Sequence, residues 1–459
     1  MAGTMLFSKI VSEGIAHNSY IIGSGGKAAV IDPRRDCDCY LEIARENDST
    51  ITHIFETHRN EDYVIGSMDL AHRCGAEIYH GARMAFGYGN SIQEGDRFAI
   101  GSLDLSVLET PGHTEESCSF VLRDKEVSPE PYMVFCGDTL FSGDIARTDF
   151  FGKRRNAEMA QKIYESITKK ILTLGEGVII CPAHGAGSIC GGDIADHPFT
   201  TVGYERLINP LLQLEQKAFV SRRKKDAPYV PPYFRQIERY NKDGAPPLNR
   251  LPLLRPLSIA DMNRIRLSGC QVVDIRSPTS YAGGHIPGSL SIWRDGVPAF
   301  IGWFLNYEQP VVLIDDFNLS LEPVLRHFVR LGYDNIYGYL AGGFPSWSRA
   351  AQEVSMTATC TVPELNMRLK TDLPFLLDVR DIKNRTRVGH IRRSHHVYVG
   401  ELPRHLAEIP SDEPIVVYCD SGYKGSLAAS VLAMHQYHNV TNVLGGMQAW
   451  KQAGFAIEK

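Results

Sequence analysis

The chain beyond residue 250 contains an internal duplication, which limits the possible folds more than any other feature. The matching segments are 272–289, 311–320 and 339–347 in the first copy and 376–394, 415–426 and 443–450 in the second. Each copy has an apolar strand ending in Asp-x-Arg, a Gly-His-Ile turn, a second apolar strand followed by a loop, and Gly-Gly-x-x-x-Trp at a helix start. Three motifs shared in one order predict two copies of one α/β domain.

The first half of the chain predicts a different α/β domain. Short β-branched or aromatic runs occur at 28–32, 51–56, 132–136 and 178–181, and a polar or turn-forming segment follows each. An apolar stripe at helical spacing comprises Met159, Ile163, Ile167, Ile171 and Leu174. Strands with polar ends and helices between them favour a layered fold with its site at the strand ends.

Four predicted strands lead into a histidine or an aspartate. These residues are His58, His113, Asp138 and His184. The ordered set resembles the metallo-β-lactamase superfamily, and the resemblance covers about residues 1–220. It implies an αββα sandwich that holds metal at the strand ends.

One motif departs from the superfamily pattern. Where the usual motif is His-x-His-x-Asp-His, this chain reads His58-Arg59-Asn60-Glu61-Asp62-Tyr63. Asn60 and Tyr63 therefore stand at two ligand positions. An amide binds soft divalent metals poorly, and a phenol must first lose its proton. Two complete metal sites are not expected.

The remaining ligand set is His58, His113 and Asp138. Two imidazoles and a carboxylate form the facial triad of non-haem Fe(II) oxygenases, although zinc with three ligands and a water also fits. The set resembles the persulfide dioxygenase branch of the superfamily, and most of all a bacterial subgroup that fuses this domain to rhodanese repeats. That resemblance implies one non-haem Fe(II) per chain.

Four further residues are candidates for supporting the metal. Asp62 and His184 stand where ligands of a second metal would lie, and we expect them instead to hydrogen bond to the ligands. Arg147 and Asp149 follow Asp138 in the chain. They form either an ion pair near the metal or an ordinary surface pair.

The second repeat carries a candidate nucleophile, Cys419, in the stretch Cys419-Asp420-Ser421-Gly422-Tyr423-Lys424-Gly425 between an apolar strand and a predicted helix. Such a loop directs backbone N–H groups and the positive helix end at its centre, so we expect a lowered thiol pKa. The loop and its flanking motifs resemble the rhodanese family, whose cysteine carries sulfane sulfur as a persulfide. A Cys-x₅-Arg phosphatase and an inert buried cysteine are the alternatives.

The first repeat has Asp315 at the position that corresponds to Cys419. A carboxylate cannot carry sulfane sulfur, so this copy is expected to be inactive. The predicted organisation is a metallo-β-lactamase-fold persulfide dioxygenase domain (1–220), a Pro-rich and charged linker (221–250), an inactive rhodanese repeat (251–355) and an active rhodanese domain (356–459).

Composition excludes several classes. Hydrophobic residues make up 43% and charged residues 22%, as in a globular protein, and the net charge of −5 does not suggest a nucleic-acid partner. The sequence has no long apolar run and no basic start before an apolar segment, so we expect neither a membrane span nor a secretory signal. Ten scattered cysteines favour a reducing, cytoplasmic setting.

Together these features predict a bifunctional enzyme of sulfide metabolism. The resemblance implies that Fe(II) and O₂ oxidise the persulfide of glutathione or another small thiol to sulfite, and that Cys419 transfers sulfur, giving thiosulfate. A homo-oligomer is expected for a fused enzyme of this kind. The main alternative is a zinc thioester hydrolase resembling glyoxalase II, with accessory rhodanese modules. A non-catalytic sulfur carrier is a third hypothesis.

Overall fold

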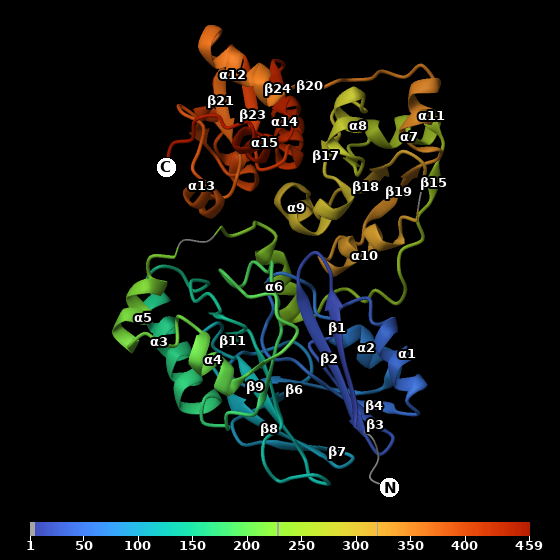
Figure 1. Cartoon of the computed structure of the whole chain (residues 1–459). Coiled ribbons are helices and arrows are strands. Elements are labelled where there is room, and N and C mark those ends of the chain that lie inside the picture. The colour runs from blue at the N-terminus through green and yellow to red at the C-terminus, as the bar shows by residue number, and fades with distance from the viewer. Residues whose placement is uncertain (1–4, 227–228, 319) are drawn as a thin grey trace. The chain divides into compact units, whose positions relative to one another are not determined.

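The computed structural model describes residues 5–226, 229–318 and 320–459. The chain divides into two compact units, of which the first comprises Met1–Leu251 with Val329–Gly332 and the second Pro252–Phe328 with Tyr333–Lys459 (Figure 1). Across the described ranges, no helix is both long enough and apolar enough to cross a membrane.

The first unit is built on two sheets. One has the order β1 (Leu6–Ser12), β2 (His17–Ser24), β3 (Lys27–Ile31), β4 (Thr50–Phe55), β5 (Glu77–Gly81) and β6 (Asn90–Ile92). The other has the order β14 (Thr200–Thr201), β13 (Ile179–Pro182), β10 (Met133–Gly137), β9 (Cys118–Asp124), β8 (Leu103–Glu109) and β7 (Arg97–Ile100). A small hairpin joins β11 (Leu140–Phe141) to β12 (Asp144–Ile145).

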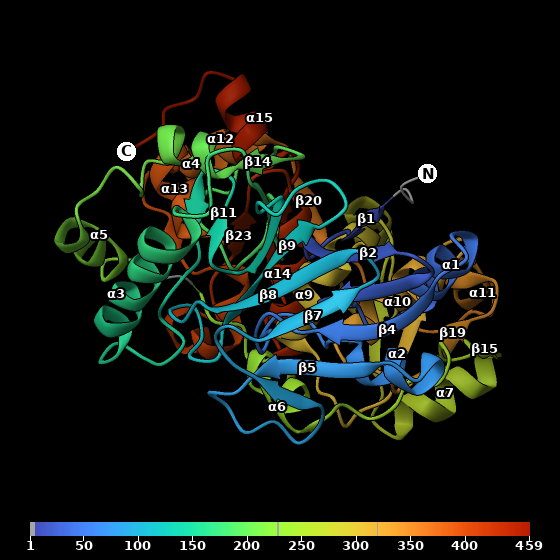
Figure 2. The same cartoon turned by 90° about the horizontal axis from the view of Figure 1, so that it is seen from below.

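Helices cover the outer face of each sheet. They are α1 (Asp38–Glu46) and α2 (Ser67–Cys74) on the first sheet, and α3 (Asn156–Ser166) with its π-helical continuation η1 (Ile167–Ile171) on the second (Figure 2). Further along the chain lie α4 (Val202–Ile208), α5 (Gln216–Arg223) and α6 (Phe234–Asp243). The predicted apolar stripe of 159–174 forms α3 and η1, and the expected αββα sandwich is confirmed.

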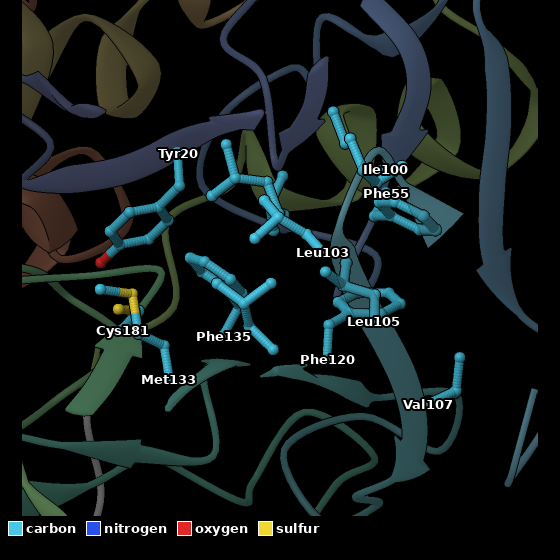
Figure 3. Close-up of a cluster of buried hydrophobic side chains, with 14 of the residues drawn as sticks. Tyr20, Phe55, Ile100, Leu103, Leu105, Val107, Phe120, Met133, Phe135 and Cys181 are labelled. Atoms are coloured by element: carbon cyan, nitrogen blue, oxygen red, sulfur yellow. The ribbon is translucent and has the colours of Figure 1, made fainter. Parts of the chain in front are cut away.

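The core between the sheets follows from the alternation of side chains along each strand. On β9, Phe120 enters the cluster between the two sheets, whereas Val121 packs in the cluster that includes α3. On β10, Phe135 likewise lies in the cluster between the sheets, and Val134 lies in the cluster that includes α3. Figure 3 shows Phe55, Phe120 and Phe135 within the inner cluster. Strands buried on both faces explain why these runs read as continuously apolar.

The second unit consists of two similar parallel sheets. The first copy has the order β15 (Pro256–Leu257), β19 (Ile336–Leu340), β18 (Val311–Ile314), β16 (Gln271–Asp274) and β17 (Leu290–Ser291). The second has the order β20 (Ala358–Cys360), β24 (Val440–Val443), β23 (Ile415–Tyr418), β21 (Phe375–Asp378) and β22 (His395–His396). The same strand order in both copies confirms the predicted duplication.

Helices connect these strands in both copies. In the first copy they are α7 (Ile259–Leu267), α8 (Pro278–Gly283), η2 (Arg294–Gly296), α9 (Val297–Phe304), α10 (Glu322–Arg330) and α11 (Gly343–Arg349). In the second they are α12 (Val362–Thr371), α13 (Ile382–Val388), η3 (Val399–Arg404), η4 (Leu406–Glu408), α14 (Tyr423–Met434) and α15 (Gly446–Gln452).

The Asp-x-Arg motif has a structural role in each copy. The guanidinium of Arg380 binds the Asp378 carboxylate at 2.6 Å and donates to the carbonyl of Gly389 at 2.8 Å. Arg276 makes the equivalent bonds to Asp274 and Gly284, at 2.6 and 2.7 Å. Both arginines are buried, so the motif ties a strand end to the Gly-His-Ile turn through a paired charge.

Candidate metal centre and sulfur-transfer loop

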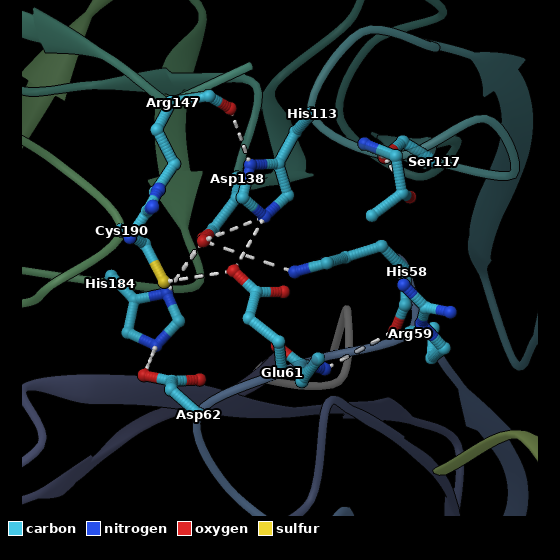
Figure 4. Close-up of polar contacts among 12 residues, drawn as sticks. His58, Arg59, Glu61, Asp62, His113, Ser117, Asp138, Arg147, His184 and Cys190 are labelled. Atoms are coloured by element: carbon cyan, nitrogen blue, oxygen red, sulfur yellow. Dashed lines mark hydrogen bonds and ion pairs between the residues drawn. The ribbon is translucent and has the colours of Figure 1, made fainter. Parts of the chain in front are cut away.

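The strand ends of the first unit bring His58, His113 and Asp138 together in the interior. His58 follows β4, His113 lies between β8 and β9, and Asp138 follows β10. The Nε2 atom of His113 lies 3.6 Å from Oδ2 of Asp138, and Nε2 of His58 lies 3.9 Å from the same oxygen (Figure 4). The three side chains are buried. The predicted trio therefore converges on one point.

Close backbone packing makes this convergence possible. Gly137 has a φ of +52°, and a Cβ atom there would lie 2.5 Å from Oγ1 of Thr57. Glycine therefore lets β10 deliver Asp138 beside the segment that carries His58.

Each imidazole is held so that Nε2 faces Asp138. The Nδ1–H of His113 donates to the carbonyl oxygen of Arg147 at 2.9 Å, and a carbonyl can only accept. Nδ1 of His58 lies 2.9 Å from Oγ1 of Thr57, whose hydroxyl donates to Asp32 at 2.7 Å. This polar chain fixes His58 with its proton on Nδ1. Both Nε2 atoms are buried; that of His58 has no hydrogen bond among the described residues, and that of His113 lies 3.2 Å from the Glu61 carboxylate.

The charges at this point favour a cation. Burial lowers the pKa of His113, but the Glu61 and Asp138 carboxylates outweigh it and raise that pKa to about 9. Burial raises the pKa of Asp138, and the imidazole of His184 reverses this, leaving that pKa well below its usual range. Burial lowers the pKa of His58 to about 4, so its imidazole is neutral. At neutral pH His113 therefore carries a proton that a bound metal would displace. The two imidazoles and the ionised oxygen then fit a divalent metal, and Fe(II) or Zn(II) both accept this donor set.

His184 and Asp62 lie beside the trio. Nδ1 of His184 lies 2.7 Å from Asp138, and its Nε2 lies 3.0 Å from Asp62. Burial lowers the pKa of His184, but the carboxylates of Asp138 and Asp62 raise it well above the ordinary value. An imidazolium bridging two carboxylates orients Asp138, and this arrangement supports the expected hydrogen-bonding role.

Asn60 and Tyr63 both lie in the buried loop. The amide nitrogen of Asn60 donates to the carbonyl of His58 at 3.2 Å. Burial raises the pKa of Tyr63 well above its usual value, so its hydroxyl keeps its proton. The Tyr63 ring packs against His17 in a tilted arrangement, with centroids 3.9 Å apart. Tyr63 therefore acts as a packed phenol rather than an anionic ligand.

Two buried residues at the site had no predicted role. Oε1 of Glu61 lies 3.2 Å from Nε2 of His113, and the thiol of Cys190 donates to the same oxygen at 3.4 Å. Candidate ligand atoms of Glu61, His113, Asp138 and Cys190 lie within 4.8 Å of one another, and so do those of Asp62, His184 and Cys190. Glu61 lies inside the motif that departs from the superfamily pattern, which was its one sequence signal. Cys190 follows no recognisable motif.

Arg147 and Asp149 form an ion pair close to the metal trio. The guanidinium binds both carboxylate oxygens at 2.8 Å, and Arg147 is buried. Because the carbonyl of Arg147 holds His113, this pair fixes the backbone that orients the imidazole. Of the two interpretations drawn from sequence, the structure agrees with an ion pair near the trio.

Helix α6 closes over the loop that follows β4. It lies in the stretch interpreted as a linker and belongs to the first unit. The Asn241 amide donates to the carbonyls of Asn60 and Tyr63, at 2.7 and 2.8 Å, and accepts from the N–H of Ile65 at 2.9 Å. One side chain thus satisfies three buried backbone groups of this loop.

The Cys419 loop joins β23 to α14 as expected. The Sγ atom accepts from the N–H of Gly422 at 3.0 Å. Behind the loop, the N–H of Met447 donates to the carbonyl of Cys419 at 2.7 Å. A Cβ atom on Gly446 would lie 2.2 Å from that carbonyl, so the Gly-Gly motif allows α15 to approach the loop.

The Cys419 thiol is less acidic than the sequence predicted. Burial raises its pKa, while the N–H groups of Ser421, Gly425 and Gly422 and the Lys424 ammonium oppose this without cancelling it. The side chain has no exposed surface, which explains why the expectation of a lowered pKa is wrong. The ammonium of Lys424 lies 2.9 Å from Asp420 and 3.7 Å from Asp381, so part of its charge is neutralised.

Asp315 occupies the corresponding place in the first copy. Its carbonyl accepts from the N–H of Phe344 at 2.7 Å, as Cys419 accepts from Met447. Its carboxylate accepts from Asn318 at 2.7 Å. Helix α14 begins at Tyr423, four positions after Cys419, whereas α10 begins at Glu322, seven positions after Asp315. The first copy thus keeps the backbone hydrogen bond behind the loop, but it has Asp315 in place of a cysteine and its helix begins three positions later.

Comparisons with known proteins match one family model to the first part of the chain and another to each of the two repeats. A model described as metallo-beta-lactamase superfamily matches residues 13–184, and one described as rhodanese-like domain matches 260–350 and 361–453. A crystal structure of a metallo-beta-lactamase from Staphylococcus aureus has 32% identity and a TM-score of 0.66, covering 73% of this chain and 99% of that one.

Two curated relatives match the first unit. Persulfide dioxygenase ETHE1 of Bos taurus is 29% identical over 214 residues, which are 44% of this chain and 74% of the relative. Hydroxyacylglutathione hydrolase GloC of Haemophilus influenzae is 28% identical over 207 residues, covering 40% and 87%. Together with the two sheets, the repeated parallel domains and the Staphylococcus aureus structure, these matches show that the chain belongs to the metallo-beta-lactamase superfamily and carries two rhodanese-like domains after that fold.

Proposed function

We propose that the first unit oxidises the persulfide of a low-molecular-weight thiol, glutathione or a similar carrier, to sulfite and the free thiol. The balanced reaction is R–S–SH + O₂ + H₂O → R–SH + SO₃²⁻ + 2 H⁺. His58, His113 and Asp138 would hold one Fe(II). The observation that carries this proposal is the convergence of two buried imidazole Nε2 atoms on the ionised carboxylate of Asp138. The similarity to persulfide dioxygenases supports the substrate class.

The protein contributes orientation and negative charge. Fe(II) would supply the redox chemistry with O₂ that zinc does not. Thr57 and the carbonyl of Arg147 keep both imidazoles pointing inward. Glu61 beside His113 keeps its negative charge, because the imidazole lowers its pKa more than burial raises it. This charge favours a cation beside His113.

Cys419 would carry the second reaction. Its thiolate takes the sulfane sulfur of a persulfide, and the loaded form transfers it to sulfite: Cys419–S–S⁻ + SO₃²⁻ → Cys419–S⁻ + S₂O₃²⁻. The N–H of Gly422 already bonds to Sγ, and the N–H groups of Ser421 and Gly425 favour the thiolate as well. Joining both reactions in one chain raises the local concentration of the shared sulfur species.

A zinc thioester hydrolase with accessory rhodanese domains is the second candidate. The similarity to GloC and the cluster of Asp62, His184 and Cys190, which could hold another ion, favour it. This reaction needs a metal-activated water and no O₂.

Oxygen consumption with glutathione persulfide, measured together with the iron and zinc content of the purified chain, separates the two functions. The dioxygenase proposal expects one iron per chain and O₂ uptake matched by sulfite formation. Two zinc ions per chain, or thioester hydrolysis without O₂ uptake on persulfide, would establish the alternative.

A further inference from the structure

A cavity of about 350 Å³ opens beside the Cys419 loop within the second unit, and both repeats line it. The active repeat contributes Asp420, Ser421, Tyr423 and Lys424, and the inactive repeat contributes Trp293, Asp295 and Phe300. This volume falls in the range of small organic ligands and exceeds what a small inorganic anion needs.

Buried contacts fix the inactive repeat in this place. The hydroxyls of Ser291 and Ser426 lie 2.8 Å apart, and the N–H of Ser291 donates to Ser430 at 3.0 Å. Trp293 lies two residues after Ser291, and its ring packs edge-on against the Tyr423 ring, with centroids 5.0 Å apart. The aromatic side of the cavity, formed by Trp293 and Tyr423, is therefore held in place by the fold of the second unit.

The charges around the cavity oppose a dianion. Lys424, the lining cation, is already paired with Asp420 and lies near Asp381. Asp295 is exposed and has no ion pair among the residues that the structure describes. Because Lys424 and Asp420 neutralise each other, Asp295 is the lining charge that remains, and a carboxylate beside aromatic rings favours a donor with an ammonium group over thiosulfate.

We infer that this cavity binds the organic part of an amine-bearing thiol persulfide, and that Asp295 of the inactive repeat selects it by pairing with the ammonium group. This inference rests on the sulfur-transfer step of the proposed function. In the step, the Cys419 thiolate attacks the outer sulfur of R–S–SH. A bond forms between Sγ of Cys419 and the outer sulfur as the S–S bond of the donor breaks, giving Cys419–S–SH and R–S⁻ with no net oxidation.

The test compares sulfur loading of the full chain, in the absence of O₂, from three donors: 2-aminoethyl persulfide, its uncharged 2-hydroxyethyl counterpart and thiosulfate. Mass spectrometry follows the gain of one sulfur atom, and Cys419→Ser identifies the loaded residue. We expect kcat/KM to favour the amine over the hydroxyl donor by about three- to tenfold. Asp295→Asn should bring this ratio close to one, and Asp295→Lys should improve loading from thiosulfate.

Glu308→Gln is the matched control, because it removes an exposed carboxylate of the same repeat that does not line the cavity. Equal loading from the amine and hydroxyl donors, or an unchanged preference in Asp295→Asn, overturns the inference while leaving sulfur transfer intact. Absence of loading from all three donors overturns the sulfur-transfer step itself, and the inference with it.

Discussion

The side-chain amide of Asn241 donates a 2.8 Å hydrogen bond to the carbonyl oxygen of Tyr63, across 178 positions of sequence. Together with its bonds to Asn60 and Ile65, this contact holds the loop that carries His58. The metal trio therefore depends on a helix outside the stretch that resembles the superfamily.

Replacing Asn241 by alanine should loosen this loop. The change leaves buried backbone groups without partners, which costs about 1–3 kcal/mol for each group that water cannot reach. We expect a lower free energy of unfolding of the first unit and a lower iron content after dialysis, measured by denaturant titration and metal analysis. Arg239→Ala, on an exposed position of the same helix, is the control. Equal iron retention in both variants would contradict this role.

Substitutions at His113 and Cys419 should separate the two activities. His113→Ala removes one nitrogen donor and should abolish both iron binding and O₂ uptake, while Cys419 still accepts sulfur. Cys419→Ser should keep O₂ uptake and lose sulfur loading. An oxygen electrode and mass spectrometry of each purified variant give the two readouts. Loss of O₂ uptake in Cys419→Ser would show that the thiol takes part in the oxidation.

Glu61→Gln should weaken metal binding without unfolding the protein. The variant removes one of the carboxylates that raise the pKa of His113, so the site attracts a cation less strongly. Supporting groups of this kind typically change metal affinity by about 10- to 100-fold, which competition with a chelator measures. Glu115→Gln is the control, since Glu115 binds Lys162 at 2.8 Å instead of facing the trio. Identical metal affinities in the two variants would show that Glu61 does not contribute to metal binding.

The pH dependence of Cys419 follows from its raised pKa. Since the thiolate is the reactive form, alkylation by neutral iodoacetamide should accelerate about tenfold for each pH unit below the thiol pKa. Lys424 favours the thiolate, so Lys424→Gln should raise the pKa further, slow alkylation at neutral pH and move the profile to higher pH. The reagent carries no charge, which separates this effect from donor binding. A profile that is flat from neutral pH upward would contradict the raised pKa.

Local patterns were sufficient to predict the strand ends and the repeats. His58, His113, Asp138 and His184 each follow a strand of β-branched and aromatic residues, and strands of this kind end at a common edge. The Asp-x-Arg and Gly-Gly motifs impose close contacts that recur in both copies. Such features depend on neighbours in sequence and are therefore visible without a structure.

Contacts between distant segments were not predictable in this way. The residue type of Asn241 does not show that its amide bonds to backbone groups of the loop after β4, because that role depends on where α6 packs. Likewise, the sequence reveals the N–H groups around Cys419 but not the extent of its burial, and burial decides the direction of its pKa shift. The cavity that includes Asp295 arises from two domains packed together.

The position of α6 also bears on where the chain can be cut. A fragment ending at residue 220 would contain the strands and every candidate ligand, yet it would lack α6, which bonds to the loop after β4. Such a fragment should leave buried amide and carbonyl groups without partners and bind its metal less tightly. A fragment extended to Leu251 keeps α6 and the Asn241 contacts, and of the first unit it lacks Val329–Gly332.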